Sequence, residues 1–253
     1  MPALSGAGGC ARCGDAVDAS AEAGLCRACR LAPPPFARAV AYGLYRGRLK
    51  DAIHALKYDR LRPAARGLGT MLAAAIAQLA PEAPEGLLVI PVPLHKKKQA
   101  HRGFNQARAL AQEALACLRK SHPQWPLTLA ATALVRTRTT ESQAGLTPRQ
   151  RRLNVRAAFR VPEGARVAKK NVLVIDDIMT TGATARAAAL ALKKASAATV
   201  WVATLARARR EGYTVNTEAT VASGLAGAEP ALPQSGNLNA HPSAQEVLTG
   251  RFS

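Results

Sequence analysis

Short apolar runs alternate along the chain with segments in which apolar side chains recur every three or four positions. The apolar runs predict strands at residues 38–45, 86–93, 127–137, 157–161, 171–175 and 198–207. The helical spacing predicts helices at residues 49–58, 67–80, 103–120 and about 183–195. Short apolar strands separated by helices are typical of a parallel sheet covered on both faces. The middle of the chain is therefore predicted to be an α/β domain.

Composition divides the chain into three blocks. Residues 1–35 hold four of the five cysteines and end in a stiff, proline-rich linker, while residues 36–210 carry the α/β pattern. Residues 211–253 are rich in Ala, Gly, Ser and Pro, so we expect a disordered tail with little apolar surface to offset the entropy of ordering. The sequence shows no apolar run of membrane-spanning length and no secretion signal, which predicts a cytoplasmic protein without membrane insertion.

The charge is strongly positive and unevenly distributed. The whole chain carries +19, but the last 43 residues hold four acids and one base, which leaves +22 on residues 1–210. Such an excess attracts polyanions, either nucleic acid or phosphorylated metabolites. An arginine-rich coding bias is an alternative explanation. Aromatic residues make up only 4% of the chain, so no platform for stacking single-stranded bases is evident.

Two cysteine pairs near the front have the spacing of a metal site. Cys10 and Cys13 form one Cys-x2-Cys knuckle, and Cys26 and Cys29 form the second. Two such knuckles can complete a tetrahedral four-thiolate site for structural Zn²⁺. A segment this short has no apolar core, so the metal would supply most of its folding free energy. Two disulfides or an iron–sulfur cluster are the alternatives.

The segment VLVIDDIMTTGAT, residues 172–184, combines two acids with a potential anion-binding turn. Asp176 and Asp177 end an apolar run, and the turn that follows leads into a helix whose free N–H groups favour a phosphate. Two adjacent carboxylates can accept hydrogen bonds from vicinal ribose hydroxyls or hold hydrated Mg²⁺. Phosphoribosyl pyrophosphate (PRPP), with Mg²⁺, has all the matching groups. A phosphoacceptor receiver domain and a merely solvated acid pair are the alternatives, but neither explains the Thr-Thr-Gly-x-Thr turn.

This segment resembles the PRPP-binding motif of type I phosphoribosyltransferases. The chain up to Arg207 is similar to the ComF/GntX family, in which a four-cysteine ribbon precedes a phosphoribosyltransferase-like domain. The supporting segments are YRGRLKDAIHALKY, IPVPLHKKKQAHRGFNQA and LVRTRTTESQAGLTPRQRRLNVRAAFRV. The resemblance implies that Asp176 and Asp177 hold the ribose diol. It also implies that the turn wraps the 5-phosphate, through Thr180, Thr181, Gly182, Ala183 and Thr184.

Basic segments elsewhere supply candidate contacts for the pyrophosphate. Lys96, Lys97 and Arg102 follow the strand at 86–93, although a solvated basic loop is an alternative for the lysines. Arg136 and Arg138 begin a long polar stretch that we expect to act as a mobile loop over the site. Many family members carry Lys-Pro-Gln where this chain has Glu-Ser-Gln at residues 141–143, and that departure removes a cation.

The resemblance implies a role in natural competence, that is, DNA uptake. One hypothesis is an enzyme, a Mg²⁺-dependent phosphoribosyltransferase (a glycosyltransferase acting by pentosyl transfer) with an unidentified acceptor. The alternative is a non-catalytic accessory protein that binds single-stranded DNA beside a competence helicase and uses the fold for binding or PRPP sensing. The residues leave open whether transfer chemistry occurs.

Overall fold

The computed structural model describes residues 9–15, 17, 24–58, 64–95, 99–100, 102–137 and 158–208. The predicted tail, Lys96, Lys97 and Arg138 lie outside these residues, as does most of the predicted mobile loop.

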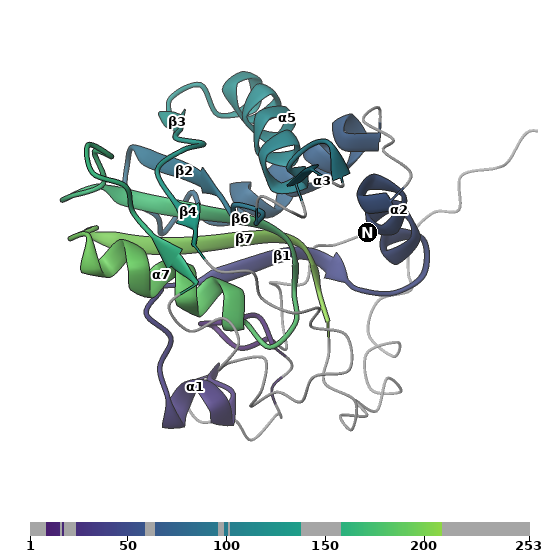
Figure 1. Ribbon diagram of the computed structural model, residues 1–253. Coiled ribbons are helices and arrows are strands. Elements are labelled where there is room, and N and C mark those ends of the chain that lie inside the picture. The colour runs from purple at the N-terminus through teal and green to yellow at the C-terminus, as the bar shows by residue number, and fades with distance from the viewer. Residues whose placement is uncertain are drawn as a thin grey trace, which may run out of the picture. The chain divides into compact units, whose positions relative to one another are not determined.

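A five-stranded parallel sheet forms the centre of the fold (Figure 1). Its order is β1 (Ala39–Leu44), β7 (Thr199–Arg207), β6 (Asn171–Met179), β2 (Leu87–Pro91) and β3 (Leu127–Leu129). Every neighbouring pair in this sheet is parallel. The predicted α/β class with a parallel sheet is therefore confirmed.

The predicted strand at residues 127–137 is wrong as a single element. β3 ends at Leu129, and the chain turns before a separate antiparallel pair, β4 (Val135–Arg136) with β5 (Phe159–Arg160). Within the turn, the Ala133 N–H donates to the carbonyl of Ala130 at 3.2 Å, while Leu134 is fully buried. An apolar run indicates burial but does not distinguish a strand from a buried turn.

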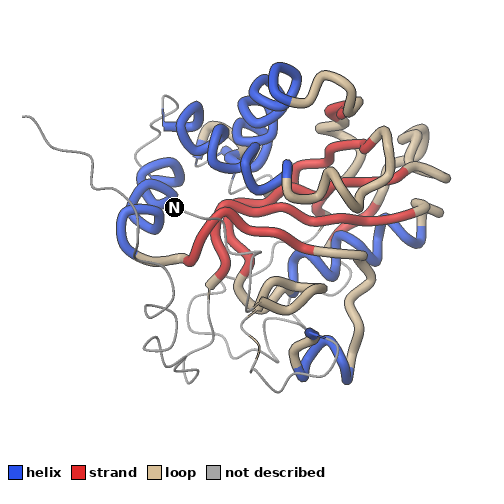
Figure 2. Tube along the Cα trace, turned by 180° about the vertical axis from the view of Figure 1, so that it is seen from behind, coloured by secondary structure: helices blue, strands red, loops and turns tan. Residues whose placement is uncertain are grey.

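Helices cover both faces of the sheet (Figures 1 and 2). α7 (Ala183–Lys194) lies on one face, while α2 (Gly47–Tyr58), α3 (Ala64–Ala77) and α5 (Gln106–Ser121) lie on the other. Each face of the sheet has its own apolar core, and strand β6 contributes side chains to both, because successive side chains of a strand point to opposite faces. Val172 and Val174 join the core beneath α7, and Leu173 and Ile175 join the core beneath α3 and α5.

Helices α3 and α5 pack with their backbones unusually close together. A Cβ added at Gly69 of α3 would lie 2.3 Å from the Cβ of Glu113 and 3.2 Å from the backbone N of Ala114. The alanine-rich sequences of both helices allow this approach along their contact.

The cysteine-bearing segment packs against the same side of the sheet as α7. It contains the short helix α1 (Arg27–Leu31), and Cys10, Cys13 and Cys29 are buried in one apolar cluster with Phe36 and residues of α7. The Ala39 N–H donates to the Arg12 carbonyl at 2.8 Å, which ties this segment to the start of β1. Within the described part of the chain, no helix is both long and apolar enough to cross a bilayer.

Candidate functional site

The two acids lie inside β6, near its carboxyl end. Strand pairing continues to Met179, so Asp176 and Asp177 are part of the strand, whereas the apolar pattern predicted that the strand ends before them. Asp176 Oδ1 accepts a hydrogen bond from the Asp177 backbone N–H at 2.9 Å. In an open parallel sheet, this edge is where ligands bind.

Two cations from distant parts of the sequence neutralise the acid pair. Lys57 of α2 places its Nζ 2.8 Å from Asp177 Oδ2, and both side chains are about 15% exposed (16% and 14%). Arg136 of β4 attracts Asp176 electrostatically, and its guanidinium lies over the Phe159 ring at 5.3 Å. The sequence pattern did not identify Lys57, because it marks α2 only as an amphipathic helix.

The acid pair is electrostatically strained. Burial, and then repulsion from Asp177, raises the pKa of Asp176 to about 7, although Lys57 and Arg136 act in the opposite direction. A carboxyl group with such a pKa changes its charge near neutral pH and responds to hydrogen-bond donors or cations placed beside it.

The turn after β6 places a left-handed glycine before the N-terminus of α7. Gly182 caps α7 with a φ of 74°, and a Cβ at this position would lie 2.9 Å from Met179 Cε. Thr181 Oγ1 accepts the Ala183 backbone N–H at 3.4 Å, while Thr184 lies in the first turn of the helix. The left-handed glycine and the first turn of α7 thus combine backbone donors with hydroxyl groups at a helix N-terminus.

The segment after β2 is held by the start of α5. The Asn105 side chain donates to the Val92 carbonyl at 3.1 Å and accepts the Arg108 backbone N–H at 3.2 Å, so it caps α5 and fixes the strand end together. Arg102 donates to Gln106 Oε1 at 3.5 Å. Gln106 is buried, and its Nε2 has no hydrogen-bond partner among the described residues.

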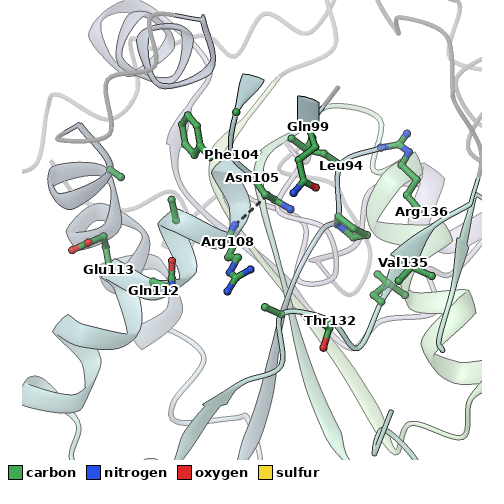
Figure 3. Close-up of a pocket in the computed structure, with 16 residues that line it drawn as sticks. Leu94, Gln99, Phe104, Asn105, Arg108, Gln112, Glu113, Thr132, Val135 and Arg136 are labelled. Atoms are coloured by element: carbon green, nitrogen blue, oxygen red, sulfur yellow. Dashed lines mark hydrogen bonds between the residues drawn. The ribbon is translucent and has the colours of Figure 1, made fainter. Parts of the chain in front are cut away.

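A cavity of about 680 Å³ opens between this segment, α5 and the turn before β4. Figure 3 shows Asn105 and Arg108 at its centre, Glu113 towards one end and Arg136 towards the other. Because Arg136 also interacts with Asp176, the cavity adjoins the acid pair. Its lining mixes polar and apolar side chains, with Gln99, Gln112 and Thr132 among the exposed groups.

The four predicted metal ligands come together. One sulfur atom from each of Cys10, Cys13, Cys26 and Cys29 lies within 4.8 Å of the others, and all four residues are free cysteines. Burial raises the pKa of Cys13 to about 12, although the Asp15 backbone N–H and the charge of Arg207 lower it. Burial also raises the pKa of Cys29, and the neighbouring thiols reinforce the effect.

Cys10 differs from the other cysteines of the cluster. Burial would raise its pKa, but backbone hydrogen bonds from Cys26, Cys13 and Arg12 lower it to about 7. Four crowded sulfur atoms resist ionisation without a cation, and a divalent ion removes that obstacle. The donor set therefore fits a metal such as zinc.

The parallel sheet, the acid pair followed by a glycine turn, and the cysteine cluster define a phosphoribosyltransferase-fold protein with a metal ribbon. A family model described as "Phosphoribosyl transferase domain" matches residues 100–224. The chain belongs to the ComF/GntX family.

Curated relatives place the chain in this family. "DNA utilization protein YhgH" of Escherichia coli O157:H7 is 35% identical over 186 residues, which cover 72% of this chain and 77% of the relative. "Competence protein F" of Haemophilus influenzae is 29% identical over 206 residues, which cover 79% and 84% of the two chains. A solved hypoxanthine phosphoribosyltransferase from Staphylococcus aureus is similar over 58% of this chain and 64% of that chain, with 12% identity and a TM-score of 0.35. That likeness is distant, so the fold assignment depends on the sheet and the family model.

Proposed function

We propose that this protein binds PRPP together with Mg²⁺ at the carboxyl edge of the sheet, and that it acts in DNA uptake. The observation that carries the first part is the acid pair near the end of β6, followed within five residues by a left-handed glycine and a helix N-terminus. The names of its relatives, "DNA utilization protein" and "Competence protein F", support the second part.

Each group of the site has a role in this proposal. Asp176 and Asp177 accept hydrogen bonds from the ribose diol, while the turn at residues 180–184 donates backbone and hydroxyl hydrogens to the 5-phosphate. Mg²⁺ would neutralise the charge of the pyrophosphate and help it to leave. Arg102, Lys96, Lys97, Arg136 and Arg138 are the proposed cations on the pyrophosphate side.

Lys57 adds a role that the sequence did not suggest. Its ammonium group occupies one oxygen of Asp177 in this structure. A sugar diol that binds the same carboxylate would share or displace that contact, and the freed ammonium would remain beside the ligand. Lys57 is therefore proposed to balance the charge of the acid pair in the absence of ligand.

Calorimetric titration of PRPP into the zinc-loaded full chain, with and without Mg²⁺, tests the binding proposal. Wild type should bind, and Asp177→Asn should weaken binding by about 10-fold or more, because a neutral amide is a poorer acceptor for two hydroxyls. Asp51→Asn is the matched control, since Asp51 is an exposed acid on α2. Absence of heat with the wild type at millimolar PRPP, or equal affinities for all three proteins, would contradict the proposal.

Single-stranded DNA binding is the second candidate function, with the protein acting as a non-catalytic accessory factor. The +22 charge of residues 1–210 favours it, as do the relatives' names. Fluorescence anisotropy with a labelled oligonucleotide across a salt series should give a log–log slope of about −0.7 for each phosphate neutralised. If the DNA surface is separate from the PRPP site, Asp177→Asn should leave that slope and the affinity unchanged. No binding at low salt would exclude this function.

Transfer chemistry requires a separate test. Phosphorus NMR can follow loss of pyrophosphate from PRPP in the presence of bases and amines. Release of pyrophosphate that depends on an acceptor and is lost in Asp177→Asn would establish the enzyme. Stable PRPP binding without release would favour sensing.

A further inference from the structure

One buried arginine connects two regions of the fold. These are the turn at residues 180–184, called the phosphate turn below, and the segment that carries Cys10 to Cys29, called the cysteine segment. Arg207 is the last residue of β7 and is 4% exposed. Its Nη1 donates to the Met179 carbonyl at 3.0 Å and also to the Thr180 carbonyl. Its Nη2 lies 3.1 Å from Asp15 Oδ2. The same guanidinium therefore binds two groups. One is the backbone that leads into the turn, and the other is the carboxylate of Asp15, which lies between the two cysteine pairs in the sequence.

Asp15 is an integral part of the first cysteine knuckle. Its carbonyl accepts the Cys10 backbone N–H at 2.6 Å, and its own backbone N–H donates to the Cys13 sulfur. A metal ion that orders Cys10 and Cys13 must therefore also order Asp15. The geometry of a metal site is commonly fixed by groups around the ligands. These include backbone N–H groups that donate to the ligating sulfurs, and charged residues that hold those backbone groups in place.

A second contact joins the two regions beside the first. Arg186 Nη2 of α7 donates to the Ala32 carbonyl at 2.9 Å, just after α1. Between the two contacts lies a cavity of about 270 Å³, whose lining includes Cys13, Asp15 and Thr181. The cysteine segment and the phosphate turn thus face each other across a small space that is bridged by two arginines.

We propose that Arg207 is a positioning residue that couples metal binding in the cysteine segment to binding of a sugar 5-phosphate in the turn. This inference depends on the proposed PRPP site. A metal held by the cysteines would order Asp15. Asp15 in turn orients the Arg207 guanidinium, which holds the carbonyls of Met179 and Thr180, so that the N–H groups after them are positioned for the phosphate. Coupling of two sites is reciprocal, so the phosphate must tighten metal binding by the same factor.

The test measures zinc affinity of the full chain by competition with a chromophoric chelator. Ribose 5-phosphate serves as the ligand probe because it engages the turn without requiring Mg²⁺, and free ribose is the control ligand without the phosphate. Saturating ribose 5-phosphate should raise the zinc affinity of wild type about fivefold or more, within the usual range of coupling between sites. Ribose should leave it unchanged.

Asp15→Asn is the decisive variant, because it keeps the shape of the side chain and removes the negative charge that forms the ion pair with Arg207. In this variant the ratio of zinc affinities with and without ribose 5-phosphate should fall to about one. Glu82→Gln is the matched control, since it breaks the Arg38–Glu82 ion pair beside the same segment without touching the turn. It should retain the wild-type ratio. Arg207→Lys, which keeps the charge but loses the planar fork, should also lower the ratio.

Each outcome decides between specific alternatives. If wild type binds ribose 5-phosphate in calorimetry but its zinc affinity does not change, the coupling is absent and the inference is overturned. If Asp15→Asn keeps the full ratio, the linkage passes through global folding and not through Arg207, which also overturns it. If wild type binds neither ribose 5-phosphate nor PRPP, the proposed function fails and the inference fails with it.

Discussion

Asp176→Asn is expected to stabilise the unliganded protein above neutral pH. In the native state, burial and Asp177 raise the pKa of Asp176 to about 7, compared with its ordinary value of 3.8. Between these two values the native state holds more protons than the unfolded chain, so stability falls as the pH rises through this window. Above pH 7 the native protein carries the full cost of an ionised, partly buried carboxylate.

The structure bounds the size of this effect. The interval from 3.8 to about 7, at about 1.4 kcal/mol for each pH unit, gives an upper limit of about 4 kcal/mol. Asp176 is not completely shielded from solvent, so we expect about 2 kcal/mol at pH 8. An asparagine conserves the volume, and its carbonyl can still accept the Asp177 N–H. The variant should therefore gain stability without a compensating loss of packing.

Urea unfolding of the zinc-loaded full chain at pH 5, 6, 7 and 8 measures the effect. The difference between Asp176→Asn and wild type should already be about a third of its full size at pH 5, should grow up to about pH 7 and should level off by pH 8. Subtracting wild type at each pH removes the contribution of the histidines, and Asp51→Asn serves as the surface control. The same Asp176→Asn protein should bind PRPP more weakly. A variant that is less stable than wild type at pH 8, or a difference that does not depend on pH, would refute the electrostatic reasoning.

Three further changes test other parts of the site. Lys57→Met removes the cation that faces Asp177 and that also lowers the pKa of Asp176. The pKa of Asp176 should therefore rise, and the pH below which PRPP affinity declines should move to a higher value in calorimetry across pH. An unchanged pH profile would exclude Lys57 from the site. Gly182→Ala puts a Cβ on a residue with a φ of 74°, so thermal unfolding should show a loss of about 1–2 kcal/mol, together with weaker ribose 5-phosphate binding. Unchanged stability and unchanged binding would contradict the argument from the left-handed turn. Cys29→Ser removes one of four sulfur donors. Metal analysis should therefore show loss of bound zinc, and the melting temperature should become insensitive to chelators. A full equivalent of zinc in the variant would contradict the four-cysteine site.

The central strands and the cysteine cluster could be predicted because their signals are local. The run before Asp176 is apolar at every position, as burial on both faces of a parallel sheet requires, and the acids that follow it mark the ligand-binding edge. The spacing of Cys10 and Cys13 alone indicates a metal knuckle. Each signal is contained within about a dozen residues, so no knowledge of tertiary contacts was needed.

Lys57 and Arg207 could not be assigned in the same way. The pattern of α2 shows which face is buried, but a lysine near its end has no local feature that points to Asp177. Arg207 did leave one signal, because a charged residue that ends an otherwise apolar strand is rarely buried without a partner. Its partner Asp15 lies at the other end of the sequence, and only the folded chain brings the two together.

The shared apolar cluster of Phe36, Cys29 and the α7 helix makes the cysteine segment inseparable from the sheet it precedes. A shortened gene product that starts at residue 36 would expose apolar side chains that the cysteine segment now covers, Phe36 among them. Such a protein should precipitate or recruit chaperones when it is synthesised. During evolution, deletion of the cysteine segment would therefore have to be accompanied by substitutions that place polar residues on the surface it now covers. Deletion of residues 1–35 alone would not be tolerated.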